Sequence, residues 1–431
     1  MEETPRALRW MPLDNAGLIF PAALRRRWSN AYRISFTFRD PVDPALLQDA
    51  LDAVAPRFPS ICARLRRSAF WYYLEELERP PAVRQDAPQP LVGMTRADVH
   101  RCAVRVLYYR SRMAVEFFHA VTDGTGAMIF TKTLAAEYVR RRYGVSVPCE
   151  EGVLDPSEPP RPQELEDSFL ENAGPVASPR DDRNVYRPGG TPEPDRFLHV
   201  TLGLVDGDAL HTMARERGVT VTAFLTAVLL DALLAMQAED VPQRRKRRPV
   251  KVQLPVNLRQ LYGGQTLRNF VAVANVGVDP RMGDYDLGQL CRVIAAQLAA
   301  EGTPQQMAGR IAANVTPQQI PLIRVIPLAL KNPVMRMIYN RRGESKGCIN
   351  LSNLGQVKLP AAMVPWVKRM EFIIGTQRSY PNNCSVLSYG GKTCINMIRN
   401  IRESELERRF FSRLVALGIP VEIECNRRKP L

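Results

Sequence analysis

A proline-rich stretch in the middle of the chain constrains its fold more than any other feature, because it separates two long regions with regular patterns. From residue 154 to residue 194 the sequence contains nine prolines, many polar residues and little periodicity. This composition favours an extended connection over a helix or a strand. The chain has 431 residues, more than the roughly 250 to 300 at which a single hydrophobic core stops growing. We therefore predict an N-terminal lobe at 1–153, a crossover linker at 154–194 and a C-terminal lobe at 195–431.

Both regions mix strand and helix patterns. In the first, we predict a strand at 31–38, a helix at 43–54, a hairpin that turns at 110–112, and a helix from about Gly124 to Arg142. In the second, we predict strands at 197–205, 250–256, 269–278, 348–355, 370–376, 383–390 and 392–398, and helices at 206–217, 219–236 and 286–301. The predicted fold class is therefore α/β, with helices layered on sheets in each of two lobes.

The net charge of +15, from 59 basic and 44 acidic residues, indicates either an acidic partner or a solubilising surface. The densest basic run is Arg244 to Arg248, and smaller clusters lie at 25–27, 140–142, 341–342 and 427–429. Interleaved aromatic residues, zinc-finger spacing and RNA-binding signatures do not accompany them, so we expect no nucleic-acid partner. Two interpretations stay open: a solvated surface, and a surface that attracts an acidic cosubstrate or an anionic carrier protein.

The first residues do not read as a secretory signal, since two glutamates follow the initial methionine and no apolar core precedes a cleavage-like site. A cytoplasmic protein is therefore expected. The eight cysteines form no C-x-x-C pair, which predicts free and mostly buried thiols. The apolar run at 219–236 contains Asp231 and three threonines, so it predicts a buried helix and not a membrane span.

Residues 320–339 are apolar with basic interruptions at Arg324, Lys331 and Arg336. The favoured interpretation is a pair of core helices broken by Pro327 and Pro333. The alternative is an interfacial helix that draws lipid substrates from a membrane, so peripheral membrane contact stays open.

The stretch from 114 to 131, AVEFFHAVTDGTGAMIFT, carries the chemistry. An alternating strand leads into His119, and Asp123 stands just before an apolar-periodic helix, where its carboxylate can cap the helix amides. Gly124 and Gly126 are expected to permit the tight strand-to-helix turn. An imidazole titrates near neutrality, so a histidine at the mouth of a rigid turn suits a general base.

From spacing alone, an ordinary histidine beside a capped helix is the commoner interpretation. A metal site would need a third ligand, and the only other histidines are His100, His199 and His211, which form no ligand-like cluster. We therefore expect no metal.

The string from His119 to Gly124 resembles the H-x-x-x-D-G signature of the chloramphenicol acetyltransferase-like superfamily. That group includes condensation domains, alcohol acetyltransferase-like proteins, wax ester synthases and polyketide-associated acyltransferases. The surroundings are similar in order as well: PVDPALLQDALDAVAPRFP, TVTAFLTAVLLDALL, LPVNLRQLYG, NFVAVANV and NLSNLGQVKLP. The resemblance therefore covers nearly the whole chain. One departure is Phe118, which stands where many condensation domains have a first histidine, and it favours the alcohol acetyltransferase-like branch.

The resemblance implies a V-shaped pseudo-dimer of two lobes with a central tunnel. His119 would act as general base, and Asp123 would be structural and pair with Arg259 of the second lobe. Ser352 and Asn353 would line the tunnel, where a side-chain donor could stabilise the oxyanion; packing at a strand end is the rival interpretation.

The implied activity is acyl transfer from a thioester to a small-molecule hydroxyl or amine acceptor. No cofactor would be bound, and acyl-coenzyme A or a phosphopantetheine-linked acyl group would be the cosubstrate. One alternative is a free-standing condensation-type enzyme that docks an acyl carrier protein. The other is a catalytically inactive basic binding protein on the same fold. A monomer is expected in each case.

Overall fold

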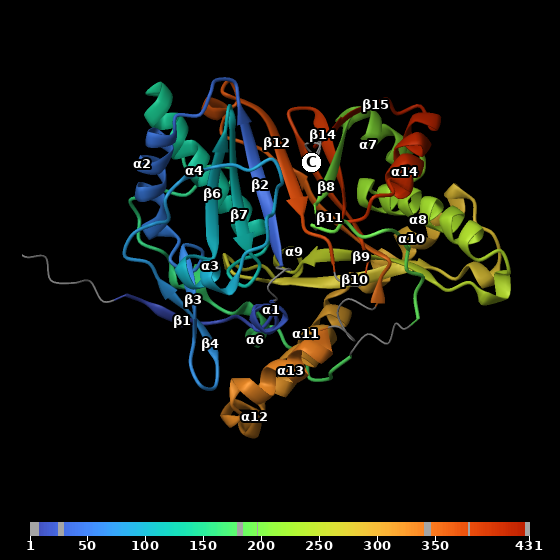
Figure 1. The fold of residues 1–431 in the computed structure, drawn as a ribbon, viewed down its shortest axis with the longest axis horizontal. Helices are drawn as coiled ribbons and strands as arrows, with labels where there is room; N and C mark the ends of the chain where they lie inside the picture. The colour runs from blue at the N-terminus through green and yellow to red at the C-terminus, as the bar shows by residue number, and fades with distance from the viewer. Residues whose placement is uncertain are drawn as a thin grey trace, which may run out of the picture.

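The computed structural model describes residues 8–24, 30–178, 184–195, 197–339, 346–377 and 380–426. Two mixed lobes lie side by side, the N-terminal one in blue and cyan and the C-terminal one in green, yellow and red (Figure 1). The basic clusters at 25–27, 341–342 and 427–429 lie outside the described residues. Arg244, Arg245 and Lys246 are exposed on the connection between helix α8 (Val221–Asp240) and strand β9 (Val250–Asn257).

The N-terminal lobe is built on a five-stranded sheet with the order β12-β2-β7-β6-β5. The predicted strand, helices and hairpin are present: β6 and β7 pair antiparallel, and Asp43 starts α2 by accepting hydrogen bonds from two backbone amides. The elements of this lobe are β2 (Ala31–Phe38), α2 (Pro44–Val54), β5 (Arg84–Gln85), α3 (Arg96–Arg101), β6 (Val104–Tyr109), β7 (Arg112–Phe118) and α4 (Gly124–Tyr143), with a small sheet of β1 (Trp10–Pro12), β4 (Tyr72–Glu76) and β3 (Ala63–Arg67).

The edge strand β12 (Val367–Ile374) comes from the second half of the chain and pairs antiparallel with β2. Its Phe372 carbonyl accepts hydrogen bonds from Ser385 Oγ at 2.5 Å and Asn396 Nδ2 at 3.0 Å, both on strands of the other sheet. Residues 195–431 therefore contribute to both sheets, and β12 ties the lobes together.

The C-terminal lobe has a seven-stranded sheet with the order β10-β9-β11-β13-β14-β8-β15. Its strands are β8 (His199–Asp206), β9 (Val250–Asn257), β10 (Val271–Val278), β11 (Ile349–Gln356), β13 (Asn382–Tyr389), β14 (Lys392–Arg399) and β15 (Val421–Cys425), and its helices are α7 (Gly207–Glu216), α8 (Val221–Asp240), α9 (Arg259–Tyr262), α10 (Leu287–Glu301) and α14 (Glu405–Ala416). Among the described residues, α8 alone is long and apolar enough to cross a membrane by length and composition, and 61% of that window is buried inside the protein. The second core surrounds α8.

The crossover is not extended over its whole length, because it contains the short helices α5 (Pro162–Leu165) and α6 (Ser168–Glu171). Buried Glu164 accepts two hydrogen bonds from Arg57 of the first lobe, at 2.5 and 2.7 Å. Its carbonyl accepts a third from Leu267 N of the second lobe, at 2.9 Å. This part of the crossover is therefore held against both lobes.

The prediction of a core helix pair at 320–339 is wrong. The segment forms α12 (Pro321–Val325) and α13 (Leu328–Ile338), which follow α11 (Pro304–Gln319) at the periphery of the molecule (Figure 1). Only Leu328 and Asn332 of α13 are buried, whereas Leu330 is 65% exposed. The reason is that α13 packs by a narrow face against α1 (Ile19–Ala23) and the β3–β4 hairpin, and none of the described elements covers its other side.

Candidate active site

The turn between β7 and α4 holds His119 and Asp123 in a fixed relation. Asp123 caps α4: its Oδ1 accepts hydrogen bonds from Thr125 N at 3.0 Å and Gly126 N at 3.2 Å. These bonds satisfy two of the amide groups that every helix start leaves without an intrahelical partner. The strand, the turn and the helix therefore form one rigid unit.

The second carboxylate oxygen of Asp123 reaches the other lobe. Oδ2 lies 2.8 Å from Arg259 Nη1 and accepts a hydrogen bond from Phe270 N, also at 2.8 Å. The predicted ion pair between Asp123 and Arg259 is thus present, and Asp123 is only 1% exposed. Four donors surround the carboxylate, so its charge is compensated in a place that water does not reach.

Arg259 also closes the loop from 258 to 270. Its Nε donates to the carbonyl of Thr266 at 2.9 Å, and its Nη2 donates to the carbonyl of Arg268 at 2.5 Å. A planar guanidinium with several fixed donors suits this task. The same side chain therefore joins the lobes and shapes the loop that faces His119.

The two glycines after Asp123 are required for space and not for an unusual backbone. Neither has a positive φ, so they permit the tight turn by leaving space: a Cβ on Gly126 would lie 2.3 Å from Thr122 Oγ1 of the same turn. A Cβ on Gly126 would lie 2.1 Å from the carbonyl oxygen of Leu267, whereas a Cβ on Gly124 would lie 2.7 Å from Leu354 Cδ2. Gly126 thus permits a backbone of the second lobe to approach α4, and Gly124 makes room for the end of a flexible side chain.

The His119 ring is oriented by a chain of polar groups. Its Nδ1 lies 3.0 Å from Asn269 Oδ1, and Asn269 Nδ2 donates to Asp14 Oδ2 at 3.1 Å. A carboxylate accepts hydrogen bonds and does not donate them, so it fixes the amide with its oxygen toward the imidazole. Nδ1 therefore carries the proton, and Nε2 keeps the lone pair of a base.

Asp14 anchors this chain in the interior, where it is fully buried. Its Oδ1 accepts from Gly17 N at 2.6 Å, and its Oδ2 accepts from Asn269 N at 3.3 Å and lies 3.6 Å from Arg268 Nε. Burial raises the pKa of Asp14, while Arg268 and the amide donors act in the opposite direction. Burial together with the charge of Asp14 also raises the pKa of the nearby Asp167.

Two aromatic rings hold the plane of the imidazole. Phe20 stacks on His119 at a centroid distance of 4.7 Å, and Tyr32 meets its edge at 5.0 Å. Tyr32 Oη donates to the carbonyl of Thr122 at 2.9 Å, and burial raises the pKa of this phenol well above its usual value, so it stays neutral. His119 N donates to the carbonyl of Asn30 at 2.8 Å, which fixes the backbone as well.

The structure places Ser352 and Asn353 on β11, beside Leu354, the residue that contacts Gly124. Asn353 Nδ2 donates to Thr222 Oγ1 at 3.0 Å, and its Oδ1 accepts from Gly355 N at 2.8 Å. Asn353 is therefore engaged with the start of α8, and one amide hydrogen is left for another partner. Its role in stabilising an oxyanion stays a prediction, as does that of Ser352.

Sequence reasoning missed Asp14, Arg268 and Asn269. Asn269 opens the quoted stretch NFVAVANV, but nothing in the pattern distinguishes it from a residue at a strand start. Asp14 precedes Gly17 by three residues, which signals a local turn only. Their importance becomes visible when the fold brings them to His119.

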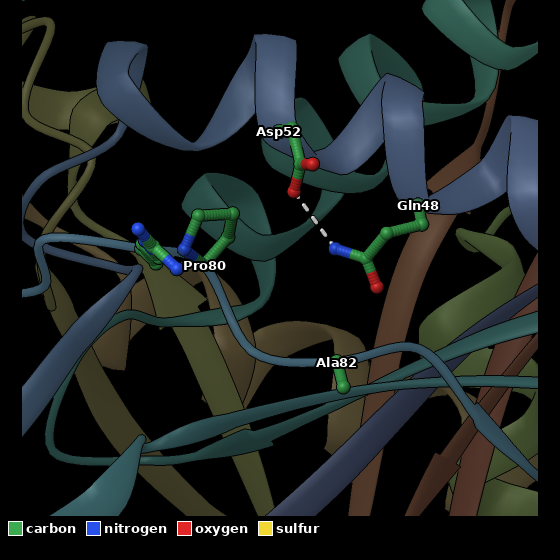
Figure 2. Close-up of a pocket in the computed structure, with 5 residues that line it drawn as sticks. Gln48, Asp52, Pro80 and Ala82 are labelled. Carbon is green, nitrogen blue, oxygen red and sulfur yellow. Dashed lines mark hydrogen bonds between the residues drawn. The ribbon is translucent and has the colours of Figure 1, made fainter.

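A surface cavity of about 520 Å³ lies elsewhere, between α2 and the loop after β4 (Figure 2). Gln48 donates to Asp52 Oδ1 of the same helix at 2.8 Å and also accepts from Val83 N at 2.7 Å. The polar groups of Gln48 therefore already have partners inside the protein. None of the residues that line the cavity belongs to the cluster around His119.

No protein-family model matches the sequence, and no curated protein matches it significantly. Solved structures match over nearly the whole chain. Polyketide synthase associated protein 5 from Mycobacterium tuberculosis has a TM-score of 0.62 at 16% identity, covering 96% of this chain and 98% of that one. The chain has the chloramphenicol acetyltransferase-like fold.

Two other matches with this fold are similar in extent. The trichothecene 15-O-acetyltransferase TRI3 from Fusarium sporotrichioides has a TM-score of 0.61 at 11% identity and covers 95% of this chain and 94% of its own. TRI101 from F. graminearum, complexed with ethyl coenzyme A, has a TM-score of 0.60 at 13% identity with 96% and 100% coverage. Condensation domains also match. The expected two-lobed α/β fold is thereby confirmed.

Proposed function

We propose that the protein is an acyltransferase that moves an acyl group from a thioester to a small-molecule hydroxyl, with His119 as general base. The observation that carries the proposal is the chain from Asp14 through Asn269 to His119, which leaves Nε2 as the basic nitrogen. An isolated core histidine needs no such arrangement. Burying a carboxylate costs free energy unless donors compensate its charge, and one of the donors to Asp14 is the amide that orients the ring.

In the proposed reaction, Nε2 accepts the proton of the acceptor hydroxyl while its oxygen attacks the thioester carbonyl carbon. The resulting tetrahedral intermediate collapses as the C–S bond breaks, and the proton on Nε2 passes to the leaving thiolate. Nδ1 keeps its hydrogen bond to Asn269 throughout, so the imidazolium that forms between the two steps is stabilised without movement of the ring. No acyl-enzyme forms, and alignment of the two substrates supplies much of the rate.

Asp123 and Arg259 have a structural part in this proposal. They touch no reacting atom; they hold the turn and the loop from 258 to 270 against each other. Gly124 admits Leu354 to the same region. We assign Ser352 and Asn353 to the wall of the proposed tunnel, where the remaining amide hydrogen of Asn353 would face the oxyanion.

The donor is proposed to be acyl-coenzyme A or an acyl group on phosphopantetheine, used as a cosubstrate by a cytoplasmic monomer. The net charge of +15 favours an anionic donor. A condensation-type reaction on a carrier protein is the second candidate. The fully buried Phe118, which replaces the first histidine of many condensation domains, favours the hydroxyl acceptor over that candidate.

The test is a panel of acyl-coenzyme A and acylated carrier proteins with alcohols and amines, scored by thiol release and product mass. His119→Ala should lower turnover by at least about a hundredfold with an unchanged circular dichroism spectrum. His211→Ala, which removes an exposed imidazole from α7, is the matched control and should keep full turnover. Full activity of the His119 variant would refute the proposal, and inactivity of the wild type toward the entire panel would favour a binding protein.

A further inference from the structure

Exposed apolar side chains are concentrated on α12, α13 and the tip of the β3–β4 hairpin. Large apolar side chains are exposed there, and we refer to these residues together as the α13 surface: Phe70 (37%), Trp71 (51%), Val325 (63%), Leu330 (65%), Val334 (50%), Met337 (46%) and Ile338 (39%). Several exposed large apolar side chains on neighbouring elements mark a candidate binding face in a protein that folds in water.

The two parts of the α13 surface are physically joined. Leu328 N donates to the carbonyl of Ala69 at 2.8 Å, and Lys331 Nζ donates to the carbonyl of Phe70 at 3.0 Å. Asn332 Nδ2 donates to Tyr72 Oη at 2.9 Å. The aromatic tip and the exposed face of α13 therefore form one continuous edge. This edge protrudes from the bottom of the molecule, where β4 and α12 reach furthest (Figure 1).

The charge of this edge is of one sign. Helix α13 contains Lys331 and Arg336 and no acidic residue, and residues 65–73 contain Arg66 and Arg67 and no acidic residue. The nearest acidic side chain of the hairpin, Glu75, is bound by Arg64 and Arg66. A protruding edge with aliphatic side chains, aromatic rings and basic residues is complementary to the headgroup layer of an anionic membrane.

The α13 surface is also connected to the candidate site. Arg336 Nε donates to the carbonyl of Ala22 in α1, the helix whose Phe20 stacks on His119. Tyr339 Oη, just after α13, lies 3.2 Å from Asn30 Oδ1, and the carbonyl of Asn30 binds the backbone of His119. A membrane bound at this surface would therefore lie beside the elements that position the base.

We propose that the α13 surface docks the protein on an anionic phospholipid membrane and that the substrate with the longer apolar chain reaches the site from there. The second half of this inference rests on the proposed acyl transfer, whereas the docking itself does not. A protein partner is the competing occupant. The membrane is favoured because these elements protrude from the molecule (Figure 1) and the hairpin carries Phe70 and Trp71 at its tip, where aromatic rings favour the interface between water and lipid.

The test measures binding of the whole protein, without any substrate, to sedimented vesicles of phosphatidylcholine alone and of phosphatidylcholine with phosphatidylglycerol. The double variant Leu330→Gln, Val334→Gln should bind anionic vesicles more than about tenfold more weakly, because two exposed aliphatic side chains that would be buried in the membrane are replaced by polar ones. The control Val415→Gln, Ile423→Gln removes two apolar side chains that are 54% and 48% exposed on α14 and β15, and it should bind like the wild type. Binding of the wild type should also weaken as salt is raised.

Three results would overturn the docking proposal. The wild type could fail to bind anionic vesicles, or the two double variants could bind these vesicles equally well. The third is that the Leu330→Gln, Val334→Gln variant still binds vesicles but no longer binds an acidic carrier protein. Activity with a short, water-soluble substrate pair separates the two proposals. The Leu330→Gln, Val334→Gln variant should keep this activity. With a substrate carried in anionic vesicles, it should be less active than the wild type. If the wild type binds vesicles but has no transferase activity, docking stands and the proposed function fails.

Discussion

The turn at 119–126 and the α13 surface both depart from the usual distribution of residues, in which charged side chains are exposed and apolar ones are buried. The turn is surrounded by buried charges, whereas the α13 surface exposes apolar side chains. Around the turn, Asp14, Asp123 and Arg268 are charged and at most 3% exposed. On the α13 surface, Leu330 and Val325 are apolar and more than 60% exposed. Burying charge and exposing apolar area both cost free energy, so neither arrangement is expected without a use.

The comparison separates two kinds of functional region. The turn is stabilised by contacts among four distant segments of the chain, and removing one partner leaves another buried group unsatisfied. The α13 surface has few contacts to lose, so its residues can change with little effect on the fold. Substitutions in the two regions should therefore differ in their effect on stability, and the following experiments test that difference.

The largest effect on stability is expected for Arg259→Ala. The change leaves Asp123 Oδ2 buried beside a single remaining donor, Phe270 N, and opens the loop from 258 to 270. Breaking a buried ion pair by removing one partner costs about 3–5 kcal/mol. Urea unfolding would measure it, and Asp123→Asn in the same chain should recover part of the loss. If Arg259→Ala leaves both stability and activity unchanged, the assigned role of the pair is wrong.

A smaller but informative effect is expected from the two glycines. Gly126→Ala forces a methyl group against the backbone carbonyl of Leu267, which cannot move aside easily, and should cost about 1–3 kcal/mol or more. Gly124→Ala meets only the end of the Leu354 side chain and should cost clearly less. Thermal unfolding of the two variants compares them directly. A larger loss in Gly124→Ala would show that backbone conformation, and not space, selects these glycines.

The sequence predicts the local half of the site and not the long-range half. The strand, the capped helix and the place of His119 follow from neighbouring residues, because periodicity and helix caps act over a few positions. The contact from His119 to Asn269 spans 150 residues, and that from Asn269 to Asp14 spans 255. Local patterns carry no information about such pairs. The pairing of Arg259 with Asp123 could be predicted only because the sequence around Arg259, LPVNLRQLYG, resembles that of a known family.

The same distinction explains the errors in the fold. The sequence predicts a strand at 370–376, which overlaps β12 (Val367–Ile374), but the pairing of β12 with β2 of the other lobe is decided by tertiary packing. Residues 320–339 have the composition of core helices, and whether such a segment is covered depends on what packs on it. An apolar segment of sequence predicts a surface that favours burial away from water. The tertiary structure decides whether the protein itself buries that surface.

The pH dependence of stability tests whether Asp14 is buried as the structure shows, and so tests the region of buried charges around the turn at 119–126. Burial raises the pKa of this carboxyl, so the folded protein binds its proton more tightly than the unfolded chain does. Its contribution to stability is fully present below the ordinary aspartate pKa of about 3.9 and is lost as the pH rises through the raised value. The stability of the wild type relative to Asp14→Asn should therefore fall as the pH rises above about 4.

Asp279 provides a control, because its contribution to stability should depend on pH in the opposite direction to that of Asp14. A hydrogen bond from Arg281 lowers the pKa of Asp279, so its contribution is present at neutral pH and is lost as the pH falls. The stability of the wild type relative to Asp279→Asn should therefore rise with pH, and modestly, since the group is near the surface. Urea unfolding of all three proteins across this range measures both slopes. Parallel curves for the wild type and Asp14→Asn would contradict the assignment.

The smallest effect on stability is expected on the α13 surface. Leu330 is already in water in the folded protein, so Leu330→Gln should change the free energy of unfolding by no more than about 0.5 kcal/mol. Leu328→Gln, two residues away, buries a polar group at a position that is 2% exposed and should cost well over 1 kcal/mol. Denaturant unfolding of the pair therefore reports whether α13 presents one face to water. Equal losses would mean that another part of the chain covers the exposed face in solution, and the membrane would then have no apolar surface to bind.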